Sequence, residues 1–190
     1  MTDLVALFNQ ALAEFGSRVH RVGADQWSAR TPCSEWDVGA LVDHVIDEQV
    51  WARPLMSGHD LEVGAAMVAS EKQRLGANRV DAWDAASLEA REAFGELGAL
   101  DRQVTLSRGP TPAADYLADM IIDVVVHSWD LGRAIGVTDA LPDDLVNFAL
   151  AGLEPHGDLS ATGLFDAPVP LPDGASAEDR LVALTGRRPR

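Results

Sequence analysis

Apolar residues recur at helical spacing along most of the chain. The first stripe lies close to the N-terminus and is formed by Leu4, Phe8, Leu12 and Phe15. Intervals of three and four residues place such side chains on one face of an α-helix. We expect this helix to run from about residue 3 to about residue 22, with Thr2 as its N-cap.

A second helix is predicted after the irregular stretch WSARTPCSEW. Ser34 and Asp37 have the spacing of a capping box, and a continuous apolar stripe follows them. This helix carries His44 and Glu48, and it should end within residues 54–58, where proline and glycine occur. Its stripe is formed by Val38, Leu41, Val42, Val45, Ile46 and Gln49.

The pattern becomes less regular in the middle of the chain. Residues 61–100 have widely spaced apolar positions, which predict one broken helix or two consecutive helices. The following stretch, QVTLSRGPTP, is the only one with an extended character. Thr111 and Pro112 then suit the cap and first turn of a long helix that ends near Gly136.

Two shorter helices are predicted in the last quarter of the chain. One should begin at Pro142 and end before Gly157. The other follows a proline-rich connection, has a capping box from Ser176 to Asp179, and stops at Gly186. The chain therefore predicts an all-α fold, a bundle of four principal helices with short extra helices at its C-terminal end.

The length and composition set the size of the fold. The chain has 190 residues, of which 47% are apolar, enough for one domain with a substantial core. We expect a single domain over residues 1–190, with the main bundle in residues 1–136 and a C-terminal extension in residues 137–190.

Charge and cysteine content narrow the functional classes. The formal net charge is -15 and Lys72 is the only lysine, so no basic patch is available for nucleic acid or for an anionic membrane surface. The single cysteine, Cys33, excludes an intramolecular disulfide and suits a reducing compartment. No secretory signal is recognisable, and no apolar run approaches the roughly 20 residues of a spanning helix. We therefore expect a soluble cytoplasmic protein.

The long helix carries polar side chains within an apolar run, in the stretch DVVVHSWDL. On a wheel of about 100° per residue, five polar side chains fall within about 40° of Asp123. These are Tyr116, Asp119, Asp123, His127 and Asp130. Periodicity favours the interpretation that this narrow stripe is the solvent face of an otherwise buried helix.

A metal site is the alternative interpretation of the stripe. Asp123 and His127 stand one helical turn apart, so a carboxylate oxygen and an imidazole nitrogen can converge on one ion. A third ligand must come from another helix, and His44 is the candidate. Yet the wheel places His44 away from the centre of its own apolar stripe, beside Glu48 and Trp51, so a surface histidine is the other interpretation.

Two segments resemble a known family at these residues. TPCSEWDVGALVDHVI and VVVHSWDLGRAIG are similar to the signature segments of the mycothiol-dependent maleylpyruvate isomerase-like proteins, metal-binding relatives of the DinB four-helix bundles. The tail DRLVALTGRRPR is similar to the end of many of these chains, so the resemblance covers nearly the whole length.

The resemblance implies an up-down-down-up bundle with a divalent ion at one end. The ion, commonly zinc, would be held by His44, Asp123 and His127, with nickel, iron or manganese as the other metals. The characterised isomerase has glutamate where this chain has Asp123, which is one methylene shorter. The family's site geometry and metal preference therefore do not carry over directly.

The resemblance also implies a function. Two histidines and one carboxylate leave a coordination position open, as in catalytic rather than structural zinc sites. In the family's isomerase, mycothiol adds to a cis double bond and leaves after rotation to trans. We therefore expect a thiol-dependent isomerase or transferase acting on a small electrophilic substrate, and such a bundle can also form a homodimer. A non-catalytic metal-binding module, such as a sensor or stress protein, and a plain helical interaction protein remain the alternatives.

Five further residues each have two interpretations. Asp130 either accepts a hydrogen bond from a ligand histidine and fixes its tautomer, or faces water. The helix wheel places Asp130 beside Asp123 and His127, which favours the first interpretation. Glu48 is either a fourth ligand or base or a solvated side chain, and Arg133 either binds an anionic substrate or pairs with acidic neighbours. Trp36 suits packing of the helix start better than substrate binding. Cys33 is either an inert thiol or one whose pKa is lowered by the dipole of the second helix.

Overall fold

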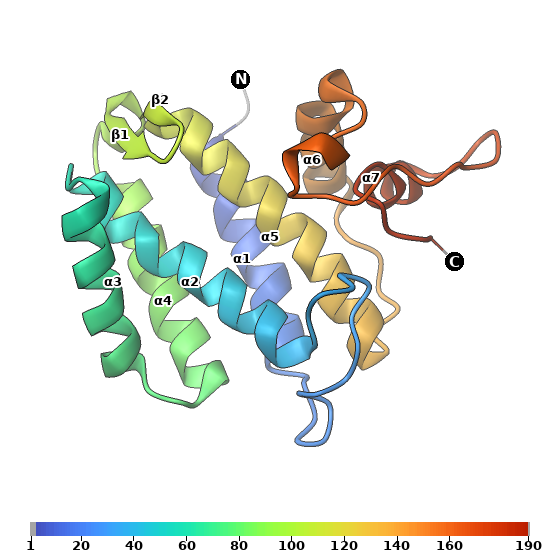
Figure 1. The fold of residues 1–190 in the computed structure, drawn as a ribbon, viewed down its shortest axis with the longest axis horizontal. Coiled ribbons are helices and arrows are strands. Elements are labelled where there is room, and N and C mark those ends of the chain that lie inside the picture. The colour runs from blue at the N-terminus through green and yellow to red at the C-terminus, as the bar shows by residue number, and fades with distance from the viewer. Residues whose placement is uncertain (1–2, 190) are drawn as a thin grey trace.

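The computed structural model describes residues 3–189 and confirms the all-α prediction (Figure 1). Within this range the α-helices are α1 (Leu4–Val19), α2 (Val38–Met56), α3 (Leu61–Leu75), α4 (Arg79–Gly95), α5 (Ala113–Ile135), α6 (Asp143–Leu153) and α7 (Ala177–Leu184). Short 3-10 turns cover Ala99–Asp101, Glu154–His156 and Ser160–Thr162. The extended stretch forms an antiparallel hairpin of β1 (Gln103–Leu106) and β2 (Gly109–Pro112).

Three helices are capped by residues other than the predicted ones. α1 is capped by Asp3, whose carboxylate accepts the N–H of Ala6, and the predicted cap Thr2 lies outside the described residues. α2 is capped by Asp37 and not by Ser34, because the chain is still extended at Asp37 and its side chain accepts the N–H of Ala40.

The start of α5 also needs correction. Thr111 belongs to β2 and does not cap the helix, since the hairpin continues up to Pro112. The predicted end is confirmed, because Gly136 follows the last helical residue with a φ of 79°, a left-handed conformation that suits glycine. The two predicted C-terminal helices are α6 and α7, and Ser176 caps α7 as expected.

The helix directions follow from contacts between helix ends. Arg79, at the start of α4, binds Asp43 near the start of α2 through two hydrogen bonds of 2.8 Å. Arg53 and Glu92 pair near the opposite ends of the same helices, so α2 and α4 run parallel. Near the ends of α1 and α5, Arg18 lies against Gly132, so these two helices are also parallel.

The two parallel pairs run in opposite directions. The Phe8 ring at the start of α1 packs edge-on against Phe94 at the end of α4, with centroids 5.4 Å apart. α1, α2, α4 and α5 therefore form an up-down-down-up bundle. α3 reverses the chain between α2 and α4 and lies on the outside of α2 (Figure 1), where Gly64 allows close contact with the Trp51 ring.

A continuous core holds the bundle together. Its largest fully buried side chains include Phe8, Leu12, Phe15, Leu41, Trp83, Phe94, Leu117, Ile121, Leu131, Leu145 and Leu181. Leu145 of α6 and Leu181 of α7 show that the C-terminal extension shares this core. No helix within residues 3–189 combines the length and the apolar character that a membrane span requires.

Candidate metal centre

The polar stripe of α5 is mostly buried over its C-terminal half. His127 is 6% exposed and Asp130 is fully buried, while the side chain of Asp123 is 31% exposed. The interpretation as a solvent face is therefore wrong here. Two segments distant in sequence cover the stripe, because Trp36 of the loop before α2 contacts His127 and Arg187 of the C-terminal tail contacts Asp130.

Two helices bring together the three candidate ligands. Oδ1 of Asp123 lies 3.4 Å from Nε2 of His44 and 3.4 Å from Nε2 of His127. One ligand atom from each residue lies within 4.8 Å of the other two. His44 is only partly exposed and faces Asp123 of α5. This position does not agree with the alternative interpretation of His44 as a surface histidine.

This spacing fits a small divalent ion. Around tetrahedral zinc with nitrogen and oxygen ligands at about 2.0–2.1 Å, neighbouring ligand atoms are about 3.3 Å apart. Oδ2 of Asp123 is buried and has no hydrogen-bond partner among the described residues. Such an orphaned carboxylate oxygen is costly unless another group satisfies it. The donor set and the unpaired oxygen therefore both fit a metal ion.

The charges of the cluster are strongly coupled. Burial opposes the ionisation of Asp123, but the charges and hydrogen bonds of His127 and His44 outweigh it and hold its pKa well below the usual range. Burial lowers the pKa of His127, whereas Asp123 and Asp130 raise it more, to about 9. Without a metal, the neutral-pH form is therefore an ionised aspartate beside a protonated histidine.

Asp130 lies behind the candidate ligand His127. Its Oδ2 is 3.0 Å from Nδ1 of His127. Burial raises the pKa of Asp130, but hydrogen bonds from His127 and Arg187 outweigh burial and lower it. An ionised carboxylate only accepts hydrogen bonds, so Nδ1 of His127 is the donor and Nε2 remains directed at Asp123.

Trp36 covers the two imidazole rings. Its ring centroid lies 4.5 Å from that of His44 and 5.5 Å from that of His127. The two imidazoles meet edge-on, with centroids 5.2 Å apart. The sequence favoured a packing role for Trp36 over substrate binding, because the place of Trp36 just before α2 gives no sign that α5 lies opposite.

Two more polar side chains border the cluster. Glu48 follows His44 by one turn, and burial and the charge of Asp123 raise its pKa. The buried hydroxyl of Tyr116 has no hydrogen-bond partner among residues 3–189, and burial together with Glu48 raises its pKa. Both groups hold their protons more strongly than exposed residues of their kind.

Arg133 is not brought to this cluster. Its guanidinium lies over the Trp129 ring, 5.4 Å from the centroid, and borders a separate hollow that also includes Arg18 and Glu178.

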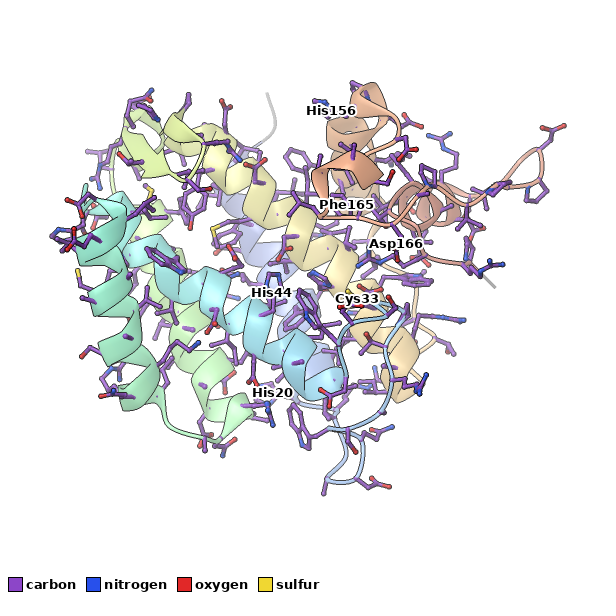
Figure 2. All side chains as sticks on the ribbon, in the orientation of Figure 1. His20, Cys33, His44, His156, Phe165 and Asp166 are labelled. Atoms are coloured by element: carbon purple, nitrogen blue, oxygen red, sulfur yellow. The ribbon has the colours of Figure 1, made fainter. Side chains whose placement is uncertain are left out.

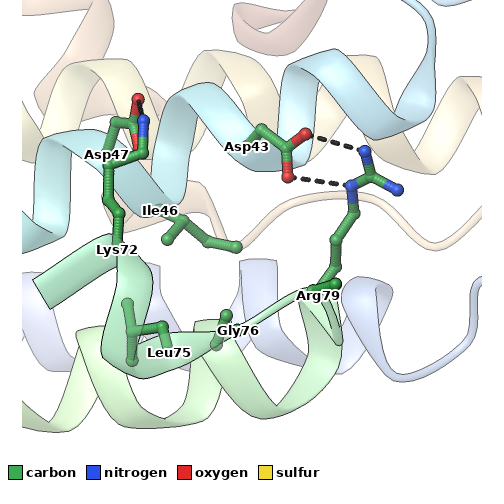
Figure 3. Close-up of a pocket in the computed structure, with 9 residues that line it drawn as sticks. Asp43, Ile46, Asp47, Lys72, Leu75, Gly76 and Arg79 are labelled. Atoms are coloured by element: carbon green, nitrogen blue, oxygen red, sulfur yellow. Dashed lines mark hydrogen bonds and ion pairs between the residues drawn. The ribbon is translucent and has the colours of Figure 1, made fainter. Parts of the chain in front are cut away.

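A cavity of about 410 Å³ lies between α2, α3 and α4 (Figure 3), and none of the three candidate ligands lines it. Its charged side chains form the ion pairs Asp43–Arg79 and Asp47–Lys72, and within each pair the two charges neutralise each other.

Cys33 lies on the loop before α2. Asp166 of the segment before α7 lies near enough for its charge to act on the Cys33 thiol, and Figure 2 labels both residues. Burial raises the pKa of the Cys33 thiol, and the positive charge of Arg187 offsets this only in part. The raised pKa agrees with the interpretation of Cys33 as an inert thiol and not with the alternative of a pKa lowered by the helix dipole, because α2 begins at Val38 and Cys33 lies outside its first turn.

Similar structures share this fold. A crystal structure of a mycothiol-dependent maleylpyruvate isomerase superimposes with a TM-score of 0.60 over 80% of this chain and 68% of that chain, at 15% identity. A histidine-to-alanine mutant of a mycothiol-dependent maleylpyruvate isomerase gives a TM-score of 0.59 over 82% of this chain and 71% of that chain, also at 15% identity.

Sequence relatives cover nearly the full length. Two proteins of Mycobacterium tuberculosis, uncharacterized protein MT0763 of strain CDC 1551 / Oshkosh and uncharacterized protein Rv0738 of strain H37Rv, are each 28% identical over 192 residues. The alignment covers 99% of this chain and all of each relative. The family model of the mycothiol maleylpyruvate isomerase N-terminal domain matches residues 8–132, more than half of the chain. The chain therefore belongs to the mycothiol maleylpyruvate isomerase family.

Proposed function

We propose that this protein binds a divalent metal ion, with zinc as the first candidate, and uses it in thiol-dependent isomerase or transferase chemistry. The thiol would be a low-molecular-weight one such as mycothiol, and the substrate a small electrophile. One observation carries the proposal, the convergence of His44, Asp123 and His127 from two helices into a cluster with metal-ligand spacing.

The chemistry of the donor set supports a catalytic role. Two imidazole nitrogens and one carboxylate leave at least one position of a tetrahedral ion free for a ligand from solution. An ion in such a site lowers the pKa of a bound thiol towards neutrality and so supplies a nucleophile for addition to a double bond.

The surrounding residues have roles that follow from their positions. His44, Asp123 and His127 would hold the ion, and Trp36, whose ring packs against the two imidazoles, would limit the access of water to them. Glu48 has a raised pKa, so it is suited to hold or transfer a proton beside the site. A reducing cytoplasm, in which low-molecular-weight thiols stay reduced, is the compartment that suits this chemistry and the single cysteine.

The first test is metal binding by untagged protein. We expect about one equivalent of metal and a rise in melting temperature when zinc is added to the metal-free protein. Asp123→Ala should abolish this rise. Asp119→Ala is the matched control, because Asp119 is exposed one turn earlier on α5 and should leave the rise unchanged. Less than about a tenth of an equivalent of metal and no stabilisation by zinc would exclude the site.

The second test separates the enzyme from a non-catalytic metal-binding module. We expect the zinc-loaded protein to bind mycothiol in a calorimeter and to accelerate thiol-dependent isomerisation or conjugation of a cis-unsaturated acid. Metal binding with no heat from mycothiol and no activity in a thiol-conjugation screen would favour the module instead.

A further inference from the structure

The C-terminal tail is fixed by the way in which α7 ends. The N–H of Gly186 donates to the carbonyl of Ala183 at 3.1 Å, and the N–H of Arg187 donates to that of Val182 at 2.9 Å. This pair of bonds is a Schellman motif, and Gly186 has the left-handed φ, 81°, that the motif requires. The backbone of Arg187 is therefore held by the helix end.

The helix that carries this motif is itself anchored in the core. Leu181 and Val182 are fully buried, and the N–H of Val169 donates to the carbonyl of Ala183 at 2.9 Å. Gly186 passes so close to Asp166 that any Cβ on it would overlap the aspartate. The end of α7 is therefore packed closely against the segment that precedes this helix.

The side chain of Arg187 reaches from this helix end to Asp130. Arg187 is 6% exposed, and its Nε and Nη2 donate to Oδ1 and Oδ2 of Asp130 at 3.2 and 2.8 Å. Its Nη1 donates to the carbonyl of Thr185 at 2.8 Å. A planar guanidinium that binds both oxygens of a carboxylate fixes the plane of that carboxylate, which a single hydrogen bond does not do.

The fixed carboxylate in turn orients a candidate ligand. Oδ2 of Asp130 also accepts the Nδ1 hydrogen of His127 at 3.0 Å, which turns Nε2 of the imidazole towards Asp123. In metal sites, a carboxylate of this kind fixes the ring orientation and tautomer of a ligand histidine.

We propose that Arg187 is a positioning residue, through which the C-terminal tail orients Asp130 and His127 and so sets the affinity of the cluster for a divalent ion. This inference rests on the proposed function, since it requires that the cluster binds a metal. Arg187 lies outside residues 8–132, the part of the chain that the family model matches. The C-terminal extension is thus part of the site, although it contributes no ligand.

The test is zinc affinity, measured by competition with a chromogenic chelator. Arg187→Met should bind zinc about 3- to 10-fold more weakly than the wild type, less than or at the low end of the roughly 10- to 100-fold effect of losing a direct partner of a ligand, because Arg187 acts through Asp130. Arg187→Lys should show a smaller loss, because an ammonium group cannot form the two-pronged contact. Arg188→Met is the matched control, since Arg188 is the exposed neighbour and its loss should change nothing.

A second readout follows the histidine directly. In zinc-loaded, nitrogen-15-labelled protein, the Nδ1 proton of His127 should exchange slowly with water in the wild type and faster in Arg187→Met. A general loss of packing would lower the stability of the protein without specifically speeding the exchange of the Nδ1 proton of His127.

The outcomes separate this inference from the proposed function. If the wild type binds no zinc, the proposed function fails and the inference fails with it. If the wild type binds zinc and folded Arg187→Met binds it within twofold as tightly, only the inference is overturned. If Arg187→Met does not fold, Arg187→Lys decides, and wild-type affinity together with wild-type proton exchange would overturn the inference.

Discussion

Ionisation of His127 in the metal-free protein should make folding depend on pH. Burial lowers the pKa of this imidazole, but Asp123 and Asp130 raise it more, from the ordinary 6.5 to about 9. The folded state therefore binds the proton more tightly than the unfolded state. The resulting stability is fully present below pH 6.5 and is lost as the pH rises through about 9.

The structure sets the size of this effect. At about 1.4 kcal/mol for each pKa unit, the difference between folded and unfolded values corresponds to up to about 3 kcal/mol. Total stabilities of small domains are about 5–15 kcal/mol, so the change is easily measured. Urea unfolding of chelator-treated protein should give a free energy of unfolding that falls by about 2–3 kcal/mol between pH 6.5 and 9.5.

A variant without the titrating group isolates this contribution. His127→Gln should lose most of the pH dependence in this range, because the variant lacks the imidazole whose pKa is raised to about 9. Equal slopes for the wild type and His127→Gln would refute the reasoning, as would a nuclear magnetic resonance titration that places the His127 pKa at or below 6.5. Zinc must also displace this proton from Nε2, so calorimetry in two buffers at pH 7 should show about one proton released by His127 per zinc bound.

Two further predictions concern packing and thiol reactivity. Gly16→Ala should lower the free energy of unfolding, measured in urea, by about 1–2 kcal/mol, because the new Cβ would come within 2.7 Å of Nε1 of Trp83. The control Gly95→Ala places its Cβ in open space, so it should be neutral or stabilising by up to about 1 kcal/mol. Equal stabilities of these two variants would contradict the packing at Trp83. Cys33 should react with iodoacetamide more slowly in the folded protein than in urea at pH 7.5, because burial raises its pKa; a faster reaction in the folded state would show an activated thiol instead.

Helical periodicity in the sequence was sufficient to predict most of the helices. Stripes such as that from Leu4 to Phe15 predict helices because one face of each must be buried, and this requirement is local to each segment. The cap at Ser176 and the stop at Gly136 were predicted for the same reason, since capping depends on residues within a few positions of the helix end. The starts of α2 and α5 were misplaced where neighbouring extended chain decides which residue is the first helical one.

The candidate site could be predicted only in part. Asp123 and His127 share a helix, so their spacing alone shows that they can meet at one ion. His44 was proposed as the third ligand because it lies on the second long helix, but its own helix wheel pointed to the surface, and the resemblance to a family then supported it as a ligand. Arg133 was also considered from its position in the sequence, and the structure places it over Trp129 instead.

The sequence by itself determined the helices, the acidic surface and the pair of polar side chains on α5. Only the tertiary structure decided that His127 and its neighbour Asp130 are enclosed rather than solvated, since the enclosing residues, Trp36 and Arg187, come from segments about 90 and 60 residues distant from His127. Periodicity describes which side chains share a face of one helix. What covers that face depends on the paths of the other segments, which short-range spacing does not encode.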